Sequence, residues 1–246
     1  MLDARILKRR REFTLDVRLH VAPGEAVGLF GGSGQGKSTL LSCLAGFEPP
    51  DAGEVRVRDR ILFPPPVPLH ERPVGYLTQN DNLFWHMSVE QNVRFGVGAR
   101  EKAGARPGPG QDDRDGPQQT TGDWIAELRQ ALGLESLWHA SVRSLSGGQA
   151  RRVALARMLA RRPMVVLLDE PFGGLDSAVM RDLTEALSTW RSRLGFALLA
   201  VDHQARWLER LGTRVVAIER GRVVHDGSWE ELRRSPPTEQ MSRLLD

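Results

Sequence analysis

The stretch GGSGQGKST at residues 31–39 decides the fold. It fits the pattern G-x-x-x-x-G-K-[ST], with its last glycine at Gly36. The apolar run AVGLF (26–30) before it predicts a strand buried on both faces, and KSTLLSCLAG (37–46) predicts a short helix that stops at Gly46. A glycine-rich turn between a buried strand and a helix presents backbone N–H groups to a phosphate. The sequence therefore predicts a phosphate-binding loop in an α/β domain.

Each position of this loop has a predicted role. The N–H groups from Ser33 to Thr39 can surround phosphates, Lys37 can bridge the β and γ groups, and the Ser38 hydroxyl can ligate Mg²⁺. A turn that only joins a strand to a helix has no need of a lysine followed by two hydroxyl residues. The predicted nucleotide-binding residues are Gly31, Gly32, Ser33, Gly34, Gln35, Gly36, Lys37, Ser38 and Thr39.

The segment MVVLLDEP (164–171) supplies the chemistry that a phosphate loop needs. Its apolar residues predict a core strand with Asp169 at the carboxyl end, where open α/β sheets bind ligands. We expect Asp169 to hold Mg²⁺ through water and Glu170 to act as the general base for the attacking water. Taken alone, an Asp-Glu pair fits a salt-bridge role equally well. Together with the glycine loop, it indicates NTP hydrolysis.

A second glycine-rich turn, LSGGQ (145–149), precedes the helical run ARRVALARMLA (150–160). No buried strand precedes it, so it cannot form a second complete site of the first kind. It can offer the Ser146 side chain and backbone N–H groups to a phosphate held elsewhere. In the simplest geometry, two copies of the chain face each other head to tail and exchange these turns. The predicted residues of this half-site are Ser146, Gly147, Gly148 and Gln149.

The rest of the chain predicts one α/β domain interrupted by helices. Residues 13–21 alternate as a half-buried strand, residues 54–62 (EVRVRDRIL) as an edge strand, and residues 74–78 return to the core. After residue 163, strands and helices alternate again, which indicates a mostly parallel sheet with helices on both faces. Predicted strands cover 164–169, 196–202 and 213–219, and predicted helices cover 177–195 and 205–212. The predicted fold is a P-loop NTPase of the RecA-like kind, with a parallel core, an antiparallel β edge and an inserted helical subdomain.

The predicted domain organisation is a single ATPase domain over 1–246. Ser88 can cap a helix through Phe95, and WIAELRQALGL (124–134) has helical spacing of apolar residues. The segment 105–122 between them is rich in Pro, Gly, Gln and Asp and has no apolar period, so we assign it no structure. The expected parts are a nucleotide-binding core (1–79 and 151–235), a helical subdomain (80–150) with a flexible loop (100–122), and a short C-terminal tail (236–246).

Composition sets the remaining limits. The chain has 246 residues and a net charge of +3, too small to indicate a nucleic-acid surface, so we expect no nucleic-acid partner. The cluster 8–11 could contact acidic lipid or RNA, or form a solvated strand end. The charged N-terminus does not resemble a signal peptide, and the single cysteine, Cys43, suits a reducing cytosol.

The motif set resembles that of the ATP-binding subunits of ABC transporters, from about residue 10 to 233. The resemblance is carried by the two glycine turns, LLDEP, Gln79 in YLTQN, Gly174-Leu175-Asp176, and VDH ending at His203, all in the family's order. It implies ATP as substrate with Mg²⁺, and a role for Gln79 in sensing the metal and the lytic water. It also implies that Asp176 communicates across a dimer and that His203 contacts the γ-phosphate. Considered alone, Gln79 would be a surface residue and His203 a satisfied or solvated histidine.

The resemblance also implies partners and a location. FTLDVRLHVAPGE before LFGGSG is similar to molybdate-type importers, whereas NDNLFWHMSVEQNVRFGV and DEPFGGLD are similar to importers of oxyanions, thiamine, iron and polyamines. Molybdate-type chains often carry a regulatory domain after about residue 240, so a thiamine-type or other short importer stays open. The implied partners are a second cassette, as a homodimer, a polytopic membrane permease and, indirectly, a solute-binding protein. The implied location is peripheral, on the cytoplasmic face of the inner membrane.

Two other functional classes fit the sequence less well. A soluble ABC ATPase acting on DNA or ribosomes usually has two cassettes or a long coiled coil, and the sequence shows neither. A P-loop kinase or GTPase would lack LSGGQ.

Three departures and alternatives remain. Gly32 replaces the proline common in the loop of this family. Phe13 is the aromatic residue available to stack on adenine, and core packing is an equal alternative. Trp85, with His86 and Met87, either docks a helix of the membrane subunit or packs in the core.

Overall fold

The computed structural model describes residues 1–97, 120–202 and 204–245, and these form two compact units. Unit 1 comprises Met1–Gln79 and Pro163–Asp246, and unit 2 comprises Asn80–Arg162. The expected boundary at residue 150 differs from this division because it would cut helix α5 (Gly147–Leu159), which packs against α2 (Val89–Phe95) within unit 2. Most of the loop expected over 100–122 lies outside the described residues.

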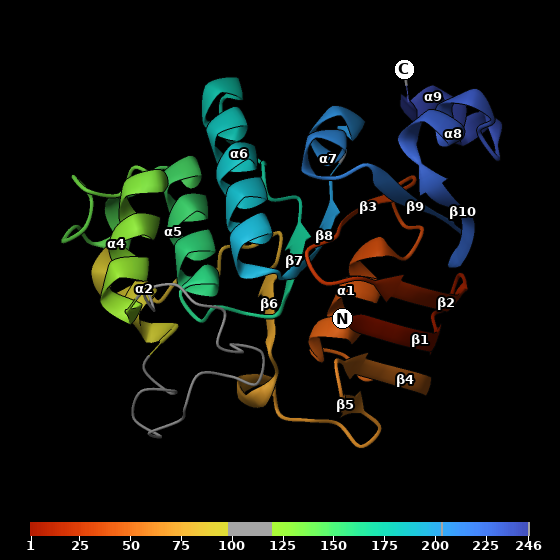
Figure 1. Ribbon diagram of the computed structural model, residues 1–246, viewed down its shortest axis with the longest axis horizontal. Coiled ribbons are helices and arrows are strands. Elements are labelled where there is room, and N and C mark those ends of the chain that lie inside the picture. Colours follow the sequence, from red (N-terminus) through yellow and green to blue (C-terminus); the bar gives the residue numbers. More distant parts are fainter. Residues whose placement is uncertain (98–119, 203, 246) are drawn as a thin grey trace. The chain divides into compact units, whose positions relative to one another are not determined.

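Unit 1 contains, in its described residues, a ten-stranded mixed sheet in the order β5-β4-β1-β2-β10-β9-β3-β8-β7-β6 (Figure 1). The strands are β1 (Leu2–Arg9), β2 (Thr14–Val21), β3 (Ala26–Phe30), β4 (Ala52–Val57), β5 (Arg60–Phe63), β6 (Val74–Leu77), β7 (Val165–Asp169), β8 (Ala197–Val201), β9 (Arg214–Glu219) and β10 (Arg222–Ser228). The helices are α1 (Lys37–Ala45), η1 (Leu69–Glu71), α6 (Ser177–Leu194), α7 (Ala205–Leu211), α8 (Trp229–Arg234) and α9 (Glu239–Leu245).

The parallel core consists of β9, β3, β8, β7 and β6. Every residue of β3, β7 and β8 is buried, as expected of strands covered on both faces. The strands predicted from the apolar runs are therefore confirmed. Because parallel strands end at the same edge of the sheet, the phosphate loop after β3 lies at the same edge as the carboxyl end of β7.

The antiparallel edge consists of β1, β2, β4 and β5. β2 alternates between exposed and buried residues along its length, as predicted. The single strand predicted over 54–62 is wrong, because the chain turns at Arg58, whose φ is +52°, and divides into β4 and β5. β1 and β10 were not predicted, and the expected C-terminal tail contains helix α9.

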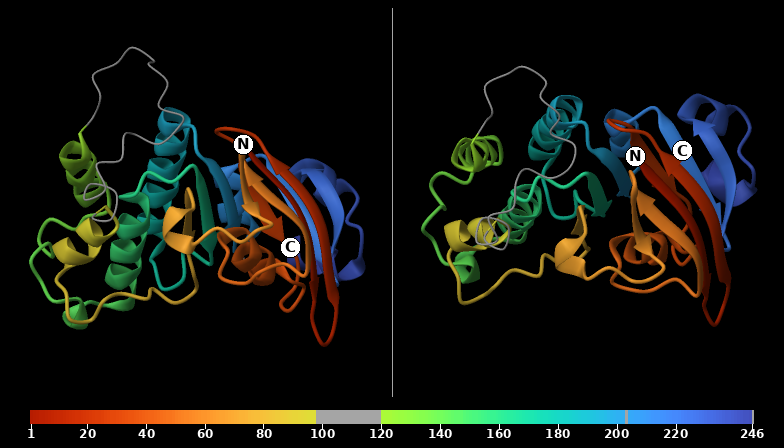
Figure 2. Two further views of the ribbon diagram at one scale, coloured as in Figure 1. Left: turned by 90° about the horizontal axis from the view of Figure 1, so that it is seen from below. Right: turned by 60° about the horizontal axis from the view of Figure 1, so that its bottom comes forward.

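Helices cover both faces of the parallel core (Figure 2). On one face, α1 packs against β1, β6 and β7, and its Leu40 and Leu41 join the buried cluster that includes Leu29. On the other face of β3, a Cβ atom at Gly28 would lie 2.8 Å from Trp229 of α8 and 3.1 Å from Leu208 of α7. This glycine therefore permits close packing of α7 and α8 on the sheet.

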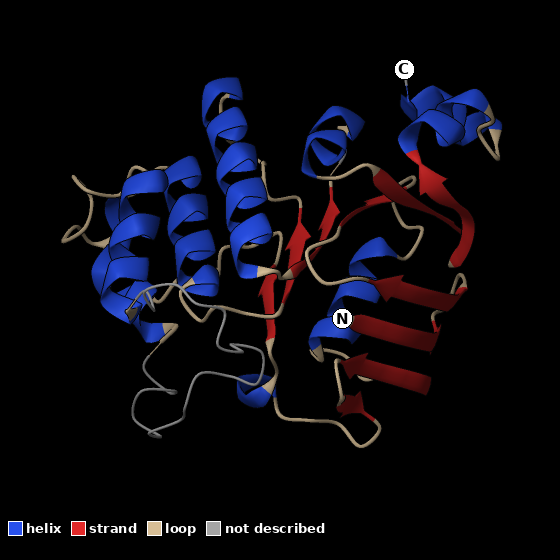
Figure 3. Ribbon diagram, viewed as in Figure 1, coloured by secondary structure: helices blue, strands red, loops and turns tan. Residues whose placement is uncertain are grey.

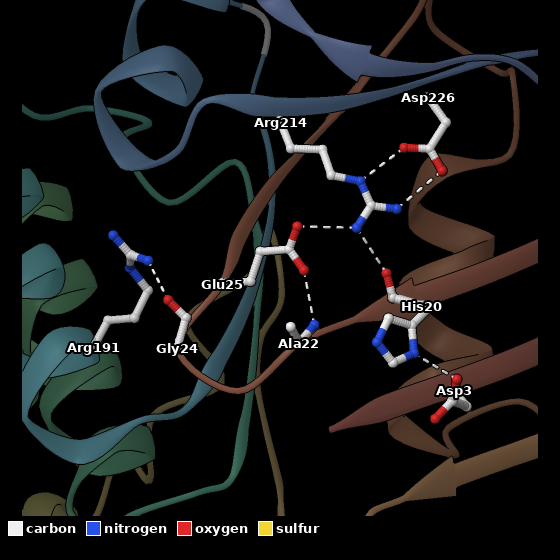
Figure 4. Close-up of polar contacts among 8 residues, drawn as sticks. All are labelled: Asp3, His20, Ala22, Gly24, Glu25, Arg191, Arg214 and Asp226. Carbon is white, nitrogen blue, oxygen red and sulfur yellow. Dashed lines mark hydrogen bonds and ion pairs between the residues drawn. The ribbon is translucent and has the colours of Figure 1, made fainter.

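A polar network ties the antiparallel edge to the parallel core at the start of β3 (Figure 4). Arg214 of β9 donates two hydrogen bonds to Asp226, at 2.7 and 2.9 Å, and one to Glu25 at 3.0 Å. It also donates to the backbone oxygen of His20, at 2.9 Å. Hydrogen bonds with Asp226 raise the pKa of Arg214. One guanidinium thus joins β2, β9, β10 and the turn before β3, on the side of the sheet away from the phosphate loop.

The regular elements of unit 2 within its described residues are helical: α2, α4 (Thr121–Ala131), η2 (Val142–Ser144) and α5 (Figure 3). Ser88 caps α2 and Thr120 caps α4, each through a reciprocal capping box. Trp124 is fully buried and donates to the Leu159 oxygen at 3.0 Å, which fixes α4 on the end of α5. In the ranges that the structure describes, we find no helix with the length and hydrophobicity needed to cross a bilayer.

Candidate nucleotide-binding site

The phosphate loop has a backbone that two of its glycines make possible. Gly36 is the N-cap of α1 with a φ of +103°, in the left-handed region. Gly31 has a φ of +140°, and a Cβ atom there would lie 2.3 Å from the Ile218 oxygen of β9. The loop therefore lies tightly against the parallel core, and its N–H groups precede a helix whose dipole favours a negative charge.

Lys37 is held at the base of the loop, with only 7% of its surface exposed. Its Nζ donates to the backbone oxygens of Gly31 and Gly32, both at 2.7 Å. Burial lowers the pKa of Lys37, while the carboxylates of Asp169 and Glu170 act in the opposite direction. An ammonium that makes only backbone contacts of this kind can exchange them for a phosphate without leaving a buried carboxylate unpaired.

Asp169 is the buried carboxylate of the site, 5% exposed at the end of β7. Its Oδ1 accepts from Ser38 Oγ at 3.1 Å, and its Oδ2 accepts from the Tyr76 hydroxyl at 3.2 Å. Burial raises the pKa of Asp169, and the two hydrogen bonds partly offset this effect. Burial also raises the pKa of Tyr76, to about 12, so its hydroxyl keeps its proton and acts as the donor.

Glu170 follows β7 with an uncommon backbone conformation. Its φ of +51° lies in the left-handed region, and its N–H donates to the Val201 oxygen of β8 at 2.9 Å. A non-glycine residue in this region costs on the order of 1–3 kcal/mol and is often found at functional sites. The Gln79 Nε2 donates to Glu170 Oε2 at 3.2 Å. The structure thus brings together two residues that the sequence separates widely.

A cleft of about 420 Å³ opens over the loop. Its lining residues are Arg10, Arg11, Glu12, Phe13, Ser33, Gly34, Gly36, Lys37, Ser38, Thr39, Glu170 and Val201. Those from the turn between β1 and β2, Arg10 to Glu12, were not predicted, because only the packing of that hairpin brings them here. Phe13 is half-buried in the cleft wall and also packs against the core, so both of its predicted roles stay open.

The C-terminal helix α9 also reaches the loop. A Cβ atom at Gly32 would lie 2.7 Å from the side-chain nitrogen of Gln240. The glycine at position 32 is thus in contact with α9, a neighbour that the sequence pattern gave no signal for.

The second glycine turn lies in unit 2 and has a different local structure. Ser146 is the exposed N-cap of α5, and its Oγ accepts from the Gln149 N–H at 3.3 Å. The Gln149 side chain accepts in turn from the Ser146 N–H at 2.8 Å. This capping box presents the hydroxyl of Ser146 and the N–H groups of Gly147 and Gly148 at a helix N-terminus.

Two further predicted residues are placed differently. Asp176 is exposed and caps α6, accepting from the N–H groups of Ala178 and Val179 at 3.0 Å each. His203 lies outside the described residues. Asp202, the residue before it, directly follows β8 and is buried.

Comparisons with known proteins show the family. Residues 14–173 match the family model described as ABC transporter. The thiamine import ATP-binding protein of Jannaschia sp. is 39% identical over 91% of this chain and 90% of its own length. The sulfate/thiosulfate import ATP-binding protein of Vibrio cholerae is 39% identical, and the molybdate/tungstate import ATP-binding protein of Pyrococcus horikoshii is 34% identical. They match 89% and 98% of this chain, which spans 55% and 65% of their lengths.

Solved structures show the same fold. A dimeric ATP-binding cassette in a post-hydrolysis state, bound to ADP and Pi, superimposes with a TM-score of 0.75. The match covers 93% of this chain and 98% of that chain, at 23% sequence identity. At this identity, the likeness describes the fold alone. The α/β fold predicted from the sequence is therefore confirmed.

Proposed function

The chain belongs to the ABC transporter family, and from this premise we propose that it hydrolyses ATP to drive solute import through a membrane permease. The family predicted from the sequence is confirmed. One observation carries the proposal: Lys37, Ser38 and Glu170 line one cleft, and Asp169 lies directly behind Ser38. The relatives named above are import proteins, which favours transport over a soluble role on DNA or ribosomes.

ATP is the substrate that this cleft fits. The N–H groups of residues 33–39 and the Lys37 ammonium surround the β- and γ-phosphates, and the positive end of α1 faces them. The rest of the nucleotide extends toward the turn between β1 and β2, where Phe13 and Arg11 line the cleft. His203 is proposed to contact the γ-phosphate.

The residues present also fit Mg²⁺. Ser38 and Asp169 place two oxygen atoms 3.1 Å apart at the loop, and the Gln79 amide, whose nitrogen donates to Glu170, carries a third oxygen. Oxygen ligands of this kind are those that Mg²⁺ takes alongside substrate phosphates. When bound, the ion neutralises the charge that develops on the phosphates.

The hydrolytic step belongs to Glu170. Its carboxylate accepts a proton from the attacking water while the oxygen of that water forms a bond to the γ-phosphorus. The bond from phosphorus to the β–γ bridging oxygen breaks, and ADP leaves with that electron pair. Gln79 donates to Glu170 and so orients the carboxylate toward the water.

The site is completed by a second copy of the chain. Ser146 and the N–H groups after it supply donors at a helix N-terminus, and we propose that they bind the γ-phosphate held by the partner's loop. Asp176, the N-cap of α6, is proposed to communicate across the dimer. Head-to-tail closure on ATP then moves the helical unit and the permease attached to it.

A complementation experiment tests this arrangement. Lys37→Ala removes the phosphate contact, and Ser146→Asp keeps an N-cap but places a negative charge where the γ-phosphate is expected. We expect each variant alone to be inactive. In a two-fold dimer, an equal mixture should regain about a quarter of the wild-type rate, since half of the dimers then hold one intact site.

Both single variants should keep the wild-type melting temperature, which controls for folding. A mixture that stays inactive would contradict the head-to-tail exchange. Full activity of Ser146→Asp alone would remove the second glycine turn from the site.

The permease is proposed to dock on unit 2. Trp85 is 59% exposed and Phe95 is 55% exposed, so the core alternative for Trp85 is wrong. Arg143 fixes the Trp85 backbone through a hydrogen bond of 3.1 Å. A helix of the membrane subunit can bury such exposed aromatic side chains. We propose that the chain works on the cytoplasmic face of the inner membrane, with a solute-binding protein that selects an oxyanion or thiamine.

Trp85→Ala tests the docking surface. We expect the variant to keep its ATPase rate as a purified cassette and to lose assembly with the permease and transport. His139→Ala, at another exposed position of unit 2, is the control. If transport and assembly survive in Trp85→Ala, the docking proposal is wrong.

A further inference from the structure

Tyr76 is a group in the site to which the mechanism above gives no role. It lies on β6 beside β7, is half-buried, and is the one tyrosine of the chain. Its hydroxyl donates to Asp169 Oδ2 at 3.2 Å. Its ring meets the Phe47 ring edge-on, with the centroids 5.6 Å apart and the planes at 73°. The phenol is thus held in one orientation against the buried carboxylate.

Helix α1 supplies the other contacts of this arrangement. Ser38 and Ser42 are four residues apart and therefore lie on the same helix face. Ser38 donates to Asp169 Oδ1 at 3.1 Å, and the Ser42 side chain lies close enough to Tyr76 to lower its pKa. We name Ser38, Ser42, Tyr76 and Asp169 the carboxylate clamp.

The clamp restrains the terminal side-chain torsion of Asp169. The terminal torsion of an aspartate is broad and roughly two-fold, so an unrestrained carboxylate can present either oxygen. A donor on each oxygen, one from α1 and one from β6, removes this freedom. Oδ1 then stays on the Ser38 side, where the phosphates and the metal are expected, and Oδ2 stays on the β6 side.

We propose that Tyr76 is a positioning residue that fixes the Asp169 carboxylate for Mg²⁺. It touches neither ATP nor the metal and acts through Asp169 alone. The inference rests on the proposed role of Asp169 in holding Mg²⁺. Groups that hydrogen-bond to a metal-holding carboxylate typically change metal affinity or activity by about 10–100-fold when they are removed.

The test compares Tyr76→Phe, which removes only the hydroxyl, with Thr184→Val. Thr184 is also buried and its hydroxyl donates one hydrogen bond, to the Met180 oxygen at 2.7 Å, but it lies on α6 away from the clamp. In Tyr76→Phe, we expect the Mg²⁺ concentration for half-maximal ATPase rate to rise about tenfold. The rate at saturating Mg²⁺ should stay near the wild-type value, and Thr184→Val should leave the Mg²⁺ requirement unchanged.

A second readout is independent of hydrolysis. Protein labelled with ¹³C-tyrosine gives a single tyrosine signal, from Tyr76. We expect this signal to shift when Mg²⁺ is titrated in with ADP, and to lose most of that response in Asp169→Asn. Ser42→Ala keeps Tyr76 but removes the hydroxyl that neighbours it on α1, so it should raise the Mg²⁺ requirement by a smaller factor. It also gives a test if Tyr76→Phe fails to fold.

Three outcomes would overturn the inference. The first is that Tyr76→Phe has the same Mg²⁺ requirement as Thr184→Val. The second is that Tyr76→Phe loses ATPase rate at saturating Mg²⁺ with no change in its Mg²⁺ requirement. The third is a tyrosine signal that does not respond to Mg²⁺ with ADP. If Asp169→Asn also leaves the Mg²⁺ requirement unchanged, the proposed role of Asp169 fails, and not only the role of Tyr76.

Discussion

The two glycine turns of this chain look alike in sequence and differ in structure. Each opens a helix, α1 after Gly36 and α5 after Ser146. The first has a left-handed glycine as N-cap and no side-chain cap, so its N–H groups are left for a ligand. The second uses Ser146 and Gln149 to satisfy its own end.

Their surroundings differ even more. The first turn continues a strand of the parallel core and lies against β9, with Lys37 and Asp169 buried beneath it. The second has exposed residues at Ser146 and Gly147 and lies in the helical unit. We therefore propose that the same local signal forms the main phosphate-binding loop where buried charges surround it, and a half-site where they do not.

The largest expected effect tests the chemistry of the first turn. Glu170→Gln keeps the shape of the side chain but cannot accept a proton, so hydrolysis should fall by about 10²–10⁴-fold. ATP binding should persist, and the variant should accumulate as an ATP-loaded dimer. Turnover measurements together with the mass in solution, with and without ATP, check both points. Retained turnover would remove Glu170 from the role of base.

The next effect compares glycines of the two turns. Gly31→Ala places a Cβ atom 2.3 Å from the Ile218 oxygen at a φ of +140°, and should lower the free energy of unfolding by about 2 kcal/mol or more. Gly147→Ala meets nothing within 4 Å and should change it by less than about 0.5 kcal/mol. Denaturant titrations measure both. Equal losses would contradict the difference between a packed turn and an open one.

The smallest expected effect is a stabilisation, opposite in sign to the losses above. Burial raises the pKa of Asp169 from 3.8, so the folded state binds more protons than the unfolded state between 3.8 and the raised value. Unfolding free energy therefore falls as pH rises through that window and stays lower above it. Asp169→Asn cannot ionise and should stabilise the nucleotide-free protein near pH 7 by about 1 kcal/mol, or roughly 2–4 °C in Tm.

Ser146→Ala provides the contrast. It removes an N-cap and should lower the free energy of unfolding by about 1 kcal/mol.

The stability gained in Asp169→Asn should vanish below about pH 3, where the wild-type carboxyl is protonated in both states. Thermal melts at both pH values check this, and a gain that does not depend on pH would contradict the assigned cause.

Much of the fold followed from periodicity. The apolar runs that became β3, β7 and β8 predicted buried strands, and the Ser88 cap predicted the start of α2. β1 and β10 were missed because their residues carry many charges, although each strand pairs with the strand next to it in sequence. The boundary of the helical unit was misplaced because the long-range packing of α5 leaves no local signal.

The site shows the same division. The phosphate loop and the Asp169-Glu170 pair were predictable because their chemistry needs particular residues at fixed short spacings. Tyr76 and Gln240 were not, because a tyrosine in a strand and a glutamine in a helix are ordinary in sequence. Their contacts with Asp169 and Gly32 depend on strand pairing and on the docking of α9.

The sequence by itself determined the family and the buried strands of the parallel core, and it predicted the residues that we propose to bind and hydrolyse ATP, because these depend on local pattern and on the chemistry of side chains. Tertiary structure alone decided which of those residues meet, how deeply Lys37 and Asp169 are buried, and what orients them. The reason is physical: burial and hydrogen-bond geometry depend on distances between segments that are remote in the chain.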